Sequence, residues 1–98
     1  MAEPAAPTPE TRVRVEEWLD YLIREWEGVP QLAAAWPKWD AATRDAFSQE
    51  WPSRDERLQE LREYAHVVVL TPAQREQYER LLHLVALHRP TLELLLAG

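Results

Sequence analysis

Residues 15–26 read VEEWLDYLIREW, and this stretch decides the fold class. Its large apolar residues recur at intervals of three and four, at Val15, Trp18, Leu19, Leu22, Ile23 and Trp26. On a helix these six positions lie within an arc of about 140°, the width of a stripe that faces a protein core. Asp20 and Arg24 form an i,i+4 pair on the outer side. The stretch therefore predicts an amphipathic helix.

Residues that start and stop helices mark the limits of this helix and of the segments after it. Thr8 is a suitable N-cap, Pro9 fits the first helical position, and Gly28 is placed to end the helix. The chain as a whole is predicted to be all-α, with residues 1–8 as a flexible N-terminal arm and residues 9–98 as one helical domain. About five helices are expected, at 9–27, 30–36, 41–51, 54–68 and 72–89, with a short terminal helix at 91–97.

Capping signals support the later helices. Asp40 is a suitable cap for the third segment. Ser53 and Glu56 have the spacing of a capping box, in which each side chain pairs with a backbone N–H of the other residue. TPAQ, at 71–74, offers the same kind of start with a proline at the first helical position. The VVVL run at 67–70 is interpreted as a helix end followed by a buried connector, because no second strand pattern could pair with it.

The last helix is apolar on two sides. Leu81 and Val85 lie on one side, whereas Leu87 and Leu94 lie nearly opposite. A helix with two apolar faces is usually covered on both. In so small a domain this indicates either a central helix or a subunit interface. Pro90 is expected to kink or break the helix.

Charge and composition narrow the classes of partner. The formal net charge is −6 and the ten arginines and single lysine form no basic run, which argues against nucleic-acid binding. Cysteine is absent, which excludes disulfides and thiolate sites. The first eight residues lack the basic and apolar regions of a secretory signal, and the longest apolar run is too short to span a bilayer. We expect a cytoplasmic protein with no nucleic-acid or membrane partner.

Few residues have the arrangement that catalysis or metal binding requires. His83 and His88 are about 140° apart around a helix, so they cannot bind one ion from the same face. Neighbouring carboxylates lie away from the apolar stripes, where their ordinary role is to form solvated surface. The two glycines are 70 residues apart and cannot build a phosphate-binding loop. The sequence therefore predicts a protein that is not an enzyme and has no cofactor or metal.

Four of the five tryptophans fall within residues 26–51. Tryptophan and arginine are the residues that most often anchor protein interfaces. Pro37 is expected to stop any helix between Trp36 and Trp39, so that at least one of these indoles stays accessible to a partner. Trp18 and Trp26, which share the first stripe, are expected in the core. The candidate partner-binding residues are Trp36, Trp39, Lys38, Arg44, Trp51, Leu87 and Leu94.

The segments EWPSRDERLQEL (50–61) and LTPAQREQYERLLHLVALHRPTLELLLAG (70–98) resemble a group of small, mostly uncharacterised bacterial helical proteins. The shared features are Trp-Pro before a charged helix, Leu-Thr-Pro-x-Gln, and a closing Arg-Pro-x-Leu. The likeness covers residues 50–98 and, loosely, 16–40. None of these motifs is a catalytic signature. The resemblance implies at most an accessory or neutralising role beside another protein.

The sequence thus favours a small non-enzymatic helical protein that acts through protein–protein contact, with a protein partner or a second copy in a homodimer. One alternative is an antitoxin-like or accessory partner that neutralises a basic protein through its negative charge. Another is a small metal- or ligand-responsive regulator that uses His66, His83 or His88.

Overall fold

The computed structural model describes the backbone of residues 9–97 and the side chains of residues 12–97, so the predicted arm at 1–8 lies outside the described residues. Five α-helices and one 3₁₀ turn follow one another: α1 (Pro9–Glu27), α2 (Val29–Ala35), η1 (Trp36–Lys38), α3 (Ala41–Glu50), α4 (Pro52–Val67) and α5 (Pro72–Ala97). Residues 9–97 contain no strand. The prediction of an all-α fold is confirmed.

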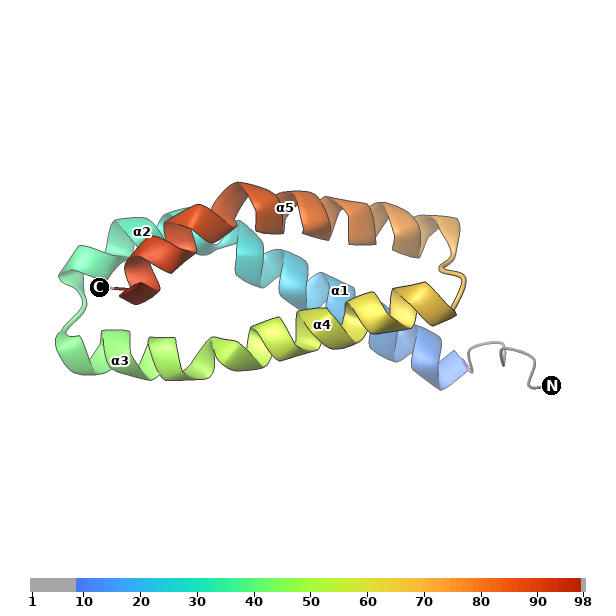
Figure 1. Ribbon diagram of the computed structural model, residues 1–98, viewed down its shortest axis with the longest axis horizontal. Helices are drawn as coiled ribbons and strands as arrows, with labels where there is room; N and C mark the ends of the chain where they lie inside the picture. The colour runs from blue at the N-terminus through green and yellow to red at the C-terminus, as the bar shows by residue number, and fades with distance from the viewer. Residues whose placement is uncertain (1–8, 98) are drawn as a thin grey trace.

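In space these segments form three helical rods, so the expectation of about five separate helices is wrong. Gly28 has helical dihedral angles, and its amide donates to the Arg24 carbonyl at 3.1 Å, so α2 continues the path of α1. Trp51 likewise links α3 to α4 with helical angles. Pro52 does not interrupt this second rod, because a proline in the first turn of a helix removes no hydrogen bond. Figure 1 shows these rods, formed by α1–α2, by α3–α4 and by α5.

α5 forms the third rod and passes through Pro90 without ending. The separate terminal helix expected at 91–97 is therefore not formed. Figure 1 shows that α5 changes direction in its C-terminal third. A proline inside a helix lacks the amide donor and crowds the preceding turn, which bends the helix. Pro90 bends α5 rather than breaking it.

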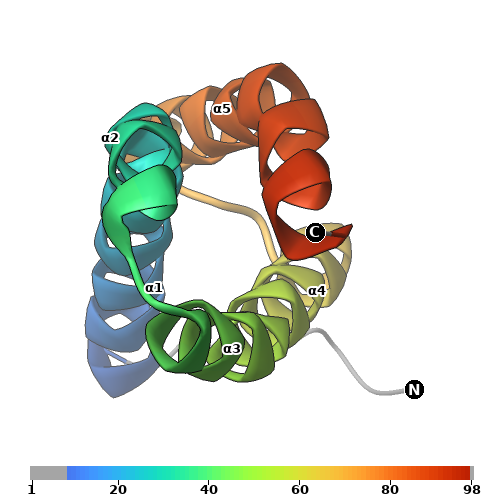
Figure 2. The same cartoon turned by 90° about the vertical axis from the view of Figure 1, so that its left-hand side faces the viewer.

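The three rods meet around α1. α5 packs along α1 and α2, and α4 packs against α1 from another side. Figure 2 shows the rods end-on, arranged as the corners of a triangle. The molecule is elongated, at 53 × 21 × 19 Å, because the rods run nearly side by side along its length.

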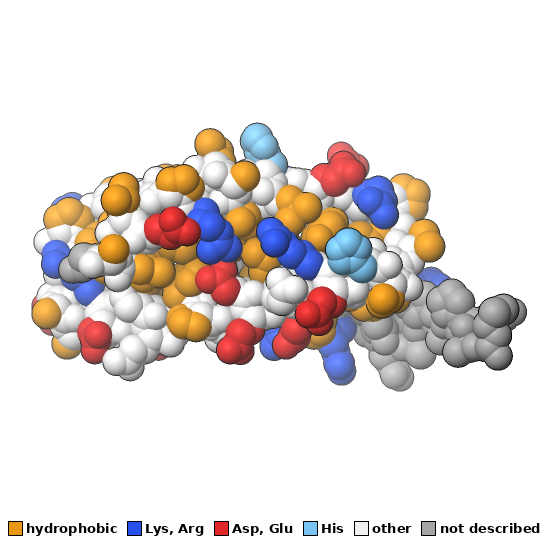
Figure 3. All heavy atoms as spheres, viewed as in Figure 1, with side chains coloured by type: hydrophobic (Ala, Val, Ile, Leu, Met, Phe, Trp, Pro, Cys, Tyr) orange, Lys and Arg blue, Asp and Glu red, His pale blue; other side chains and the backbone are white. Residues whose placement is uncertain are grey.

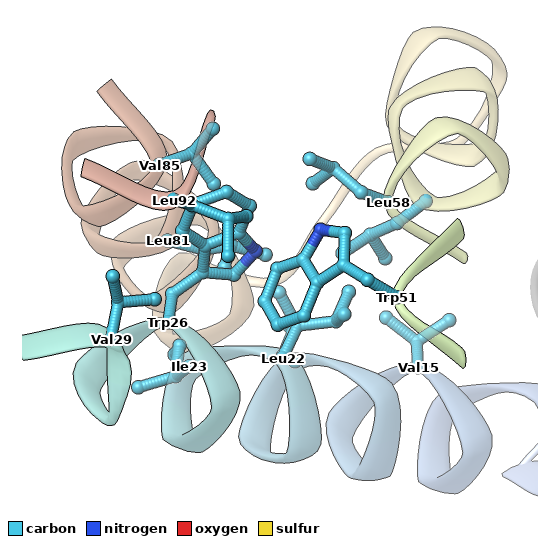
Figure 4. Packing of buried hydrophobic residues seen from close by; sticks show 12 residues of the cluster. Val15, Leu22, Ile23, Trp26, Val29, Trp51, Leu58, Leu81, Val85 and Leu92 are labelled. Atoms are coloured by element: carbon cyan, nitrogen blue, oxygen red, sulfur yellow. The ribbon is translucent and has the colours of Figure 1, made fainter. Parts of the chain in front are cut away.

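The predicted stripe of the first helix forms the centre of the core. Five of its six residues are buried, and they pack with buried residues from the other rods, as Figure 4 shows. Those partners are Val29, Trp51, Leu58, Leu61, Leu81, Val85 and Leu92. Trp18 is the exception: it is half-buried at the edge of the core, and the Arg57 guanidinium lies 4.6 Å from its ring centroid. The expectation that Trp18 is a core residue is therefore wrong.

The start of α5 has the predicted capping box. The backbone amide of Gln74 donates to the Thr71 hydroxyl oxygen at 3.1 Å, and the backbone amide of Thr71 donates to the Gln74 side-chain oxygen at 3.1 Å. The capping box predicted for Ser53 is not formed, because α4 begins at Pro52 and the Ser53 hydroxyl donates to the Glu50 carbonyl. The connector at 67–70 is buried only at Leu70, so that part of the prediction is also wrong.

Asp40 caps α3 as predicted. Its carboxylate accepts a hydrogen bond from the Thr43 amide at 2.8 Å. Hydrogen bonds from the Thr43 side chain and backbone lower the pKa of the Asp40 carboxyl below its ordinary value. The stabilisation from this cap is therefore present above the ordinary aspartate pKa, and it is lost as the pH falls through the lowered pKa of the folded chain.

Leu19→Ala and Leu22→Ala test the central stripe. Both side chains are fully buried, so each change should lower the free energy of unfolding by about 2–5 kcal/mol. Chemical denaturation followed by circular dichroism measures the loss. Leu87→Ala, which truncates an exposed leucine, is the control and should change stability by less than about 0.5 kcal/mol. Parental stability of both core variants would show that α1 does not hold this core.

Candidate interaction surfaces

The tryptophan-rich segment is folded inward. η1 includes Pro37, and the Trp39 amide donates to the Trp36 carbonyl at 3.2 Å. The two indoles therefore lie on the same side, with ring centroids 5.8 Å apart, and both contact Phe47 of α3. Trp36 is only 8% exposed and Trp39 is half-buried. The expectation that Pro37 leaves one indole substantially accessible is wrong, because a 3₁₀ turn accommodates proline and brings both rings onto Phe47.

Aromatic contacts continue from this segment into the core. The ring centroids of Phe47 and Trp51 are 5.5 Å apart, and Trp51 meets Trp26 edge-to-face at 5.2 Å. We call the five connected rings the aromatic chain, formed by Trp26, Trp36, Trp39, Phe47 and Trp51. Trp51 is 2% exposed, and Figure 4 shows it projecting toward Trp26 from the opposite rod. It is a core residue and offers no surface to a partner.

Arginines cover the aromatic chain. The Arg44 Nε donates to the Trp36 carbonyl oxygen at 2.9 Å, and its guanidinium lies 5.9 Å from the Trp36 ring centroid. Arg44, a candidate partner-binding residue, therefore contacts Trp36 within the fold. Arg54, which sequence reasoning missed, lies 5.4 Å from the Trp51 ring centroid. Its spacing of three residues from Trp51 on a helical path is the signal that could have revealed it. Lys38 is exposed.

A groove of about 330 Å³ lies beside the aromatic chain. Its walls are formed by Glu25, Gly28, Gln31, Leu32, Ala35, Trp39, Phe47 and Trp51. The Glu25 carboxylate is held by Arg54 at 3.2 Å, so the negative charge at the rim is already paired. Burial raises the pKa of the nearby Tyr21 hydroxyl above its ordinary value. The positive charge of Arg54 lowers this pKa, and Glu25 raises it further. The groove is thus mainly an apolar hollow, with its charged group engaged inside the fold.

The outer face of α5 is the candidate surface that remains open. Leu87 and Leu94 are 59% and 78% exposed, so the expectation of a central helix covered on both sides is wrong, and the alternative of an interface stays a prediction. The two leucines are seven residues apart, close to two helical turns, so they lie on the same face. Of the seven candidate residues, only these two leucines and Lys38 are exposed.

The three histidines do not come together as a site. His66 and His83 are exposed and His88 is half-buried. Within the described part of the chain, no three His, Asp or Glu residues are placed to share a metal ion. Among those same residues, no helix is both long enough and apolar enough to cross a bilayer.

Comparisons with protein-family models, with curated proteins and with solved structures find no match to this chain. The resemblance to small bacterial helical proteins therefore stays a prediction.

Trp51 and Trp39 provide a matched test of the inward folding. Trp51→Ala should cost about 3–5 kcal/mol of unfolding free energy because the indole is fully packed, whereas Trp39→Ala should cost less. Acrylamide quenching should show that Trp39→Phe removes more of the quenchable fluorescence than Trp51→Phe does. The reverse order in both measurements would mean that the aromatic chain is not packed as described.

Proposed function

We propose that the protein is a non-catalytic binding protein whose α5 outer face receives an amphipathic helix of a basic partner protein. The observation that carries this proposal is the exposure of Leu87 and Leu94 on one face of α5. Recognition of an amphipathic helix by spaced apolar anchors is a common mode of protein–protein contact.

The two leucines do not stabilise the described fold. The inner face of α5 supplies the core through Leu81, Val85 and Leu92. Leu87 and Leu94 point away from that core and lie in solvent. Burying one leucine contributes about 1.5–3 kcal/mol, so covering both leucines adds a sizeable hydrophobic contribution to the free energy of binding a partner.

Charge around this face favours a basic partner over a second copy. Glu76 lies on the same face, three turns before Leu87, and Glu79 and Glu93 lie on its flank. Arg80, seven residues before Leu87, lies on this same face, where its charge is engaged in an ion pair with Glu27 at 2.9 Å. Two such faces would set carboxylates against carboxylates, whereas lysines or arginines beside a partner's apolar stripe would be attracted. The net charge of −6 acts in the same direction.

This charge pattern also supports the antitoxin-like or accessory alternative, because in that alternative the acidic chain binds and neutralises a basic protein. The metal- or ligand-responsive alternative has no comparable support from the placement of His66, His83 and His88.

The experiment places a photo-crosslinking amino acid at position 94 of the full chain, expressed in its native cells. We expect a crosslink to a basic protein through a helical segment, identified by mass spectrometry. The same crosslinker at Tyr21, an exposed position on α1, is the matched control and should not give that product.

A Leu87→Ser, Leu94→Ser double variant then tests the contact with the purified partner. Binding should weaken about 100-fold or more, since each leucine contributes at least about tenfold, while the melting temperature stays at the parental value. Crosslinking only to a second copy would replace the basic partner with self-association. If the crosslinker at position 21 gave the same product as the crosslinker at position 94, the outer face of α5 would not be the binding site.

A further inference from the structure

A second, separate feature lies between α4 and α5. A hollow of about 200 Å³ is lined by Arg62, Ala65, His66, Arg75 and Tyr78. Four of these five side chains carry hydrogen-bond donors, and the lining includes no carboxylate. Figure 3 shows blue and pale-blue side chains over the seam between α4 and α5 on this face.

Arg62 and Arg75 differ from the other arginines of these two helices. Four arginines of α4 and α5 are ion-paired with carboxylates, namely Arg54, Arg57, Arg80 and Arg89. Within residues 12–97, neither Arg62 nor Arg75 has an ion pair or a side-chain hydrogen bond to another residue. Of the six arginines of α4 and α5, the two that form no ion pair with the described residues both line one hollow, in a chain with net charge −6.

We infer that this hollow binds a phosphate group. The two guanidinium groups offer forked donors that match phosphate oxygens, and His66 and Tyr78 add an N–H and an O–H. The volume corresponds to about seven water molecules at about 30 Å³ each, enough for a phosphate and the first atoms of its ester.

The overall negative charge does not prevent this binding. At physiological salt, charges are screened over about 8 Å, so an anion in the hollow responds mainly to the groups around it. The nearby carboxylate of Glu63 accepts a hydrogen bond from Gln59 at 3.4 Å, and it does not line the hollow.

A phosphate group could come from a small phosphomonoester or from a lipid headgroup. The residues after His66 help to choose between these sources, because Val67 at the end of α4 and Val69 in the connector that follows are 71% and 88% exposed. Exposed valines beside a phosphate site suit the apolar boundary of a lipid surface. The phosphate chemistry is the same for both sources, and the experiment distinguishes them.

The first arm titrates the full chain with inorganic phosphate and with glycerol 3-phosphate at constant ionic strength. Two-dimensional NMR should show saturable shifts of the amides around residues 62–66 and 75–78. Arg62→Gln and Arg75→Gln should each weaken binding about tenfold, as expected for loss of a charge-assisted hydrogen bond.

Arg80→Gln is the matched control. It removes the same charge from α5, but its guanidinium is paired with Glu27 away from the hollow, so phosphate binding should stay within about twofold of the parent. Both lining arginines are exposed, so their variants should keep the parental melting temperature.

The second arm measures flotation with phosphatidylcholine vesicles that contain or lack phosphatidic acid. Binding only to phosphatidic acid vesicles, lost in Arg62→Gln and weakened in Val69→Ser, would identify a lipid headgroup. Binding of glycerol 3-phosphate without vesicle binding would identify a small phosphomonoester. The inference is overturned if neither arm shows saturable binding, or if Arg80→Gln weakens binding as much as Arg62→Gln does.

Discussion

The edge-to-face contact between Trp26 and Trp51 is the interaction on which the rest of the structure depends. It joins the α1–α2 rod to the α3–α4 rod with ring centroids 5.2 Å apart. Both indole N–H groups are buried with no hydrogen-bond partner among the described residues, which costs about 1–3 kcal/mol each. Burying an indole removes about 150–250 Å² from water, which contributes roughly 4–6 kcal/mol at about 25 cal/mol/Å². Burial therefore outweighs the unpaired donors, and a small domain without cysteine gains a stable centre.

Each central indole is covered by an arginine that a carboxylate of another helix holds. Arg54 lies over Trp51 and pairs with Glu25 of α1, and Arg89 of α5 lies over Trp26 and pairs with Asp55 of α4. These two pairs connect α4 to α1 and α5 to α4 over the core. Four arginines of α4 and α5 are used within the fold in this way or in other ion pairs, which leaves Arg62 and Arg75 for the hollow.

The sequence best predicts features that depend on one segment alone, such as the position and the start of a helix. The period of the apolar residues places α1, the Thr71–Gln74 capping box places the start of α5, and opposite angular positions on one helix put Leu87 and Leu94 away from the core side of α5. The expected helix ends at 51 and 89 lie beside Pro52 and Pro90, yet Pro52 starts α4 on a continuing rod, and Pro90 bends α5, which is one of the two outcomes expected for it. The burial of Trp36 and the convergence of Arg62 with Arg75 depend on how separate segments pack, which no periodicity within one segment records.

A double-mutant cycle on Trp26 and Trp51 tests the central claim most directly. Unfolding free energies of Trp26→Leu, Trp51→Leu and the double variant give the coupling between the two indoles. If this contact joins the rods, the coupling should be about 0.5–1.5 kcal/mol beyond the loss of burial. Additive effects, within about 0.3 kcal/mol, would contradict the account and show that the two indoles are buried independently.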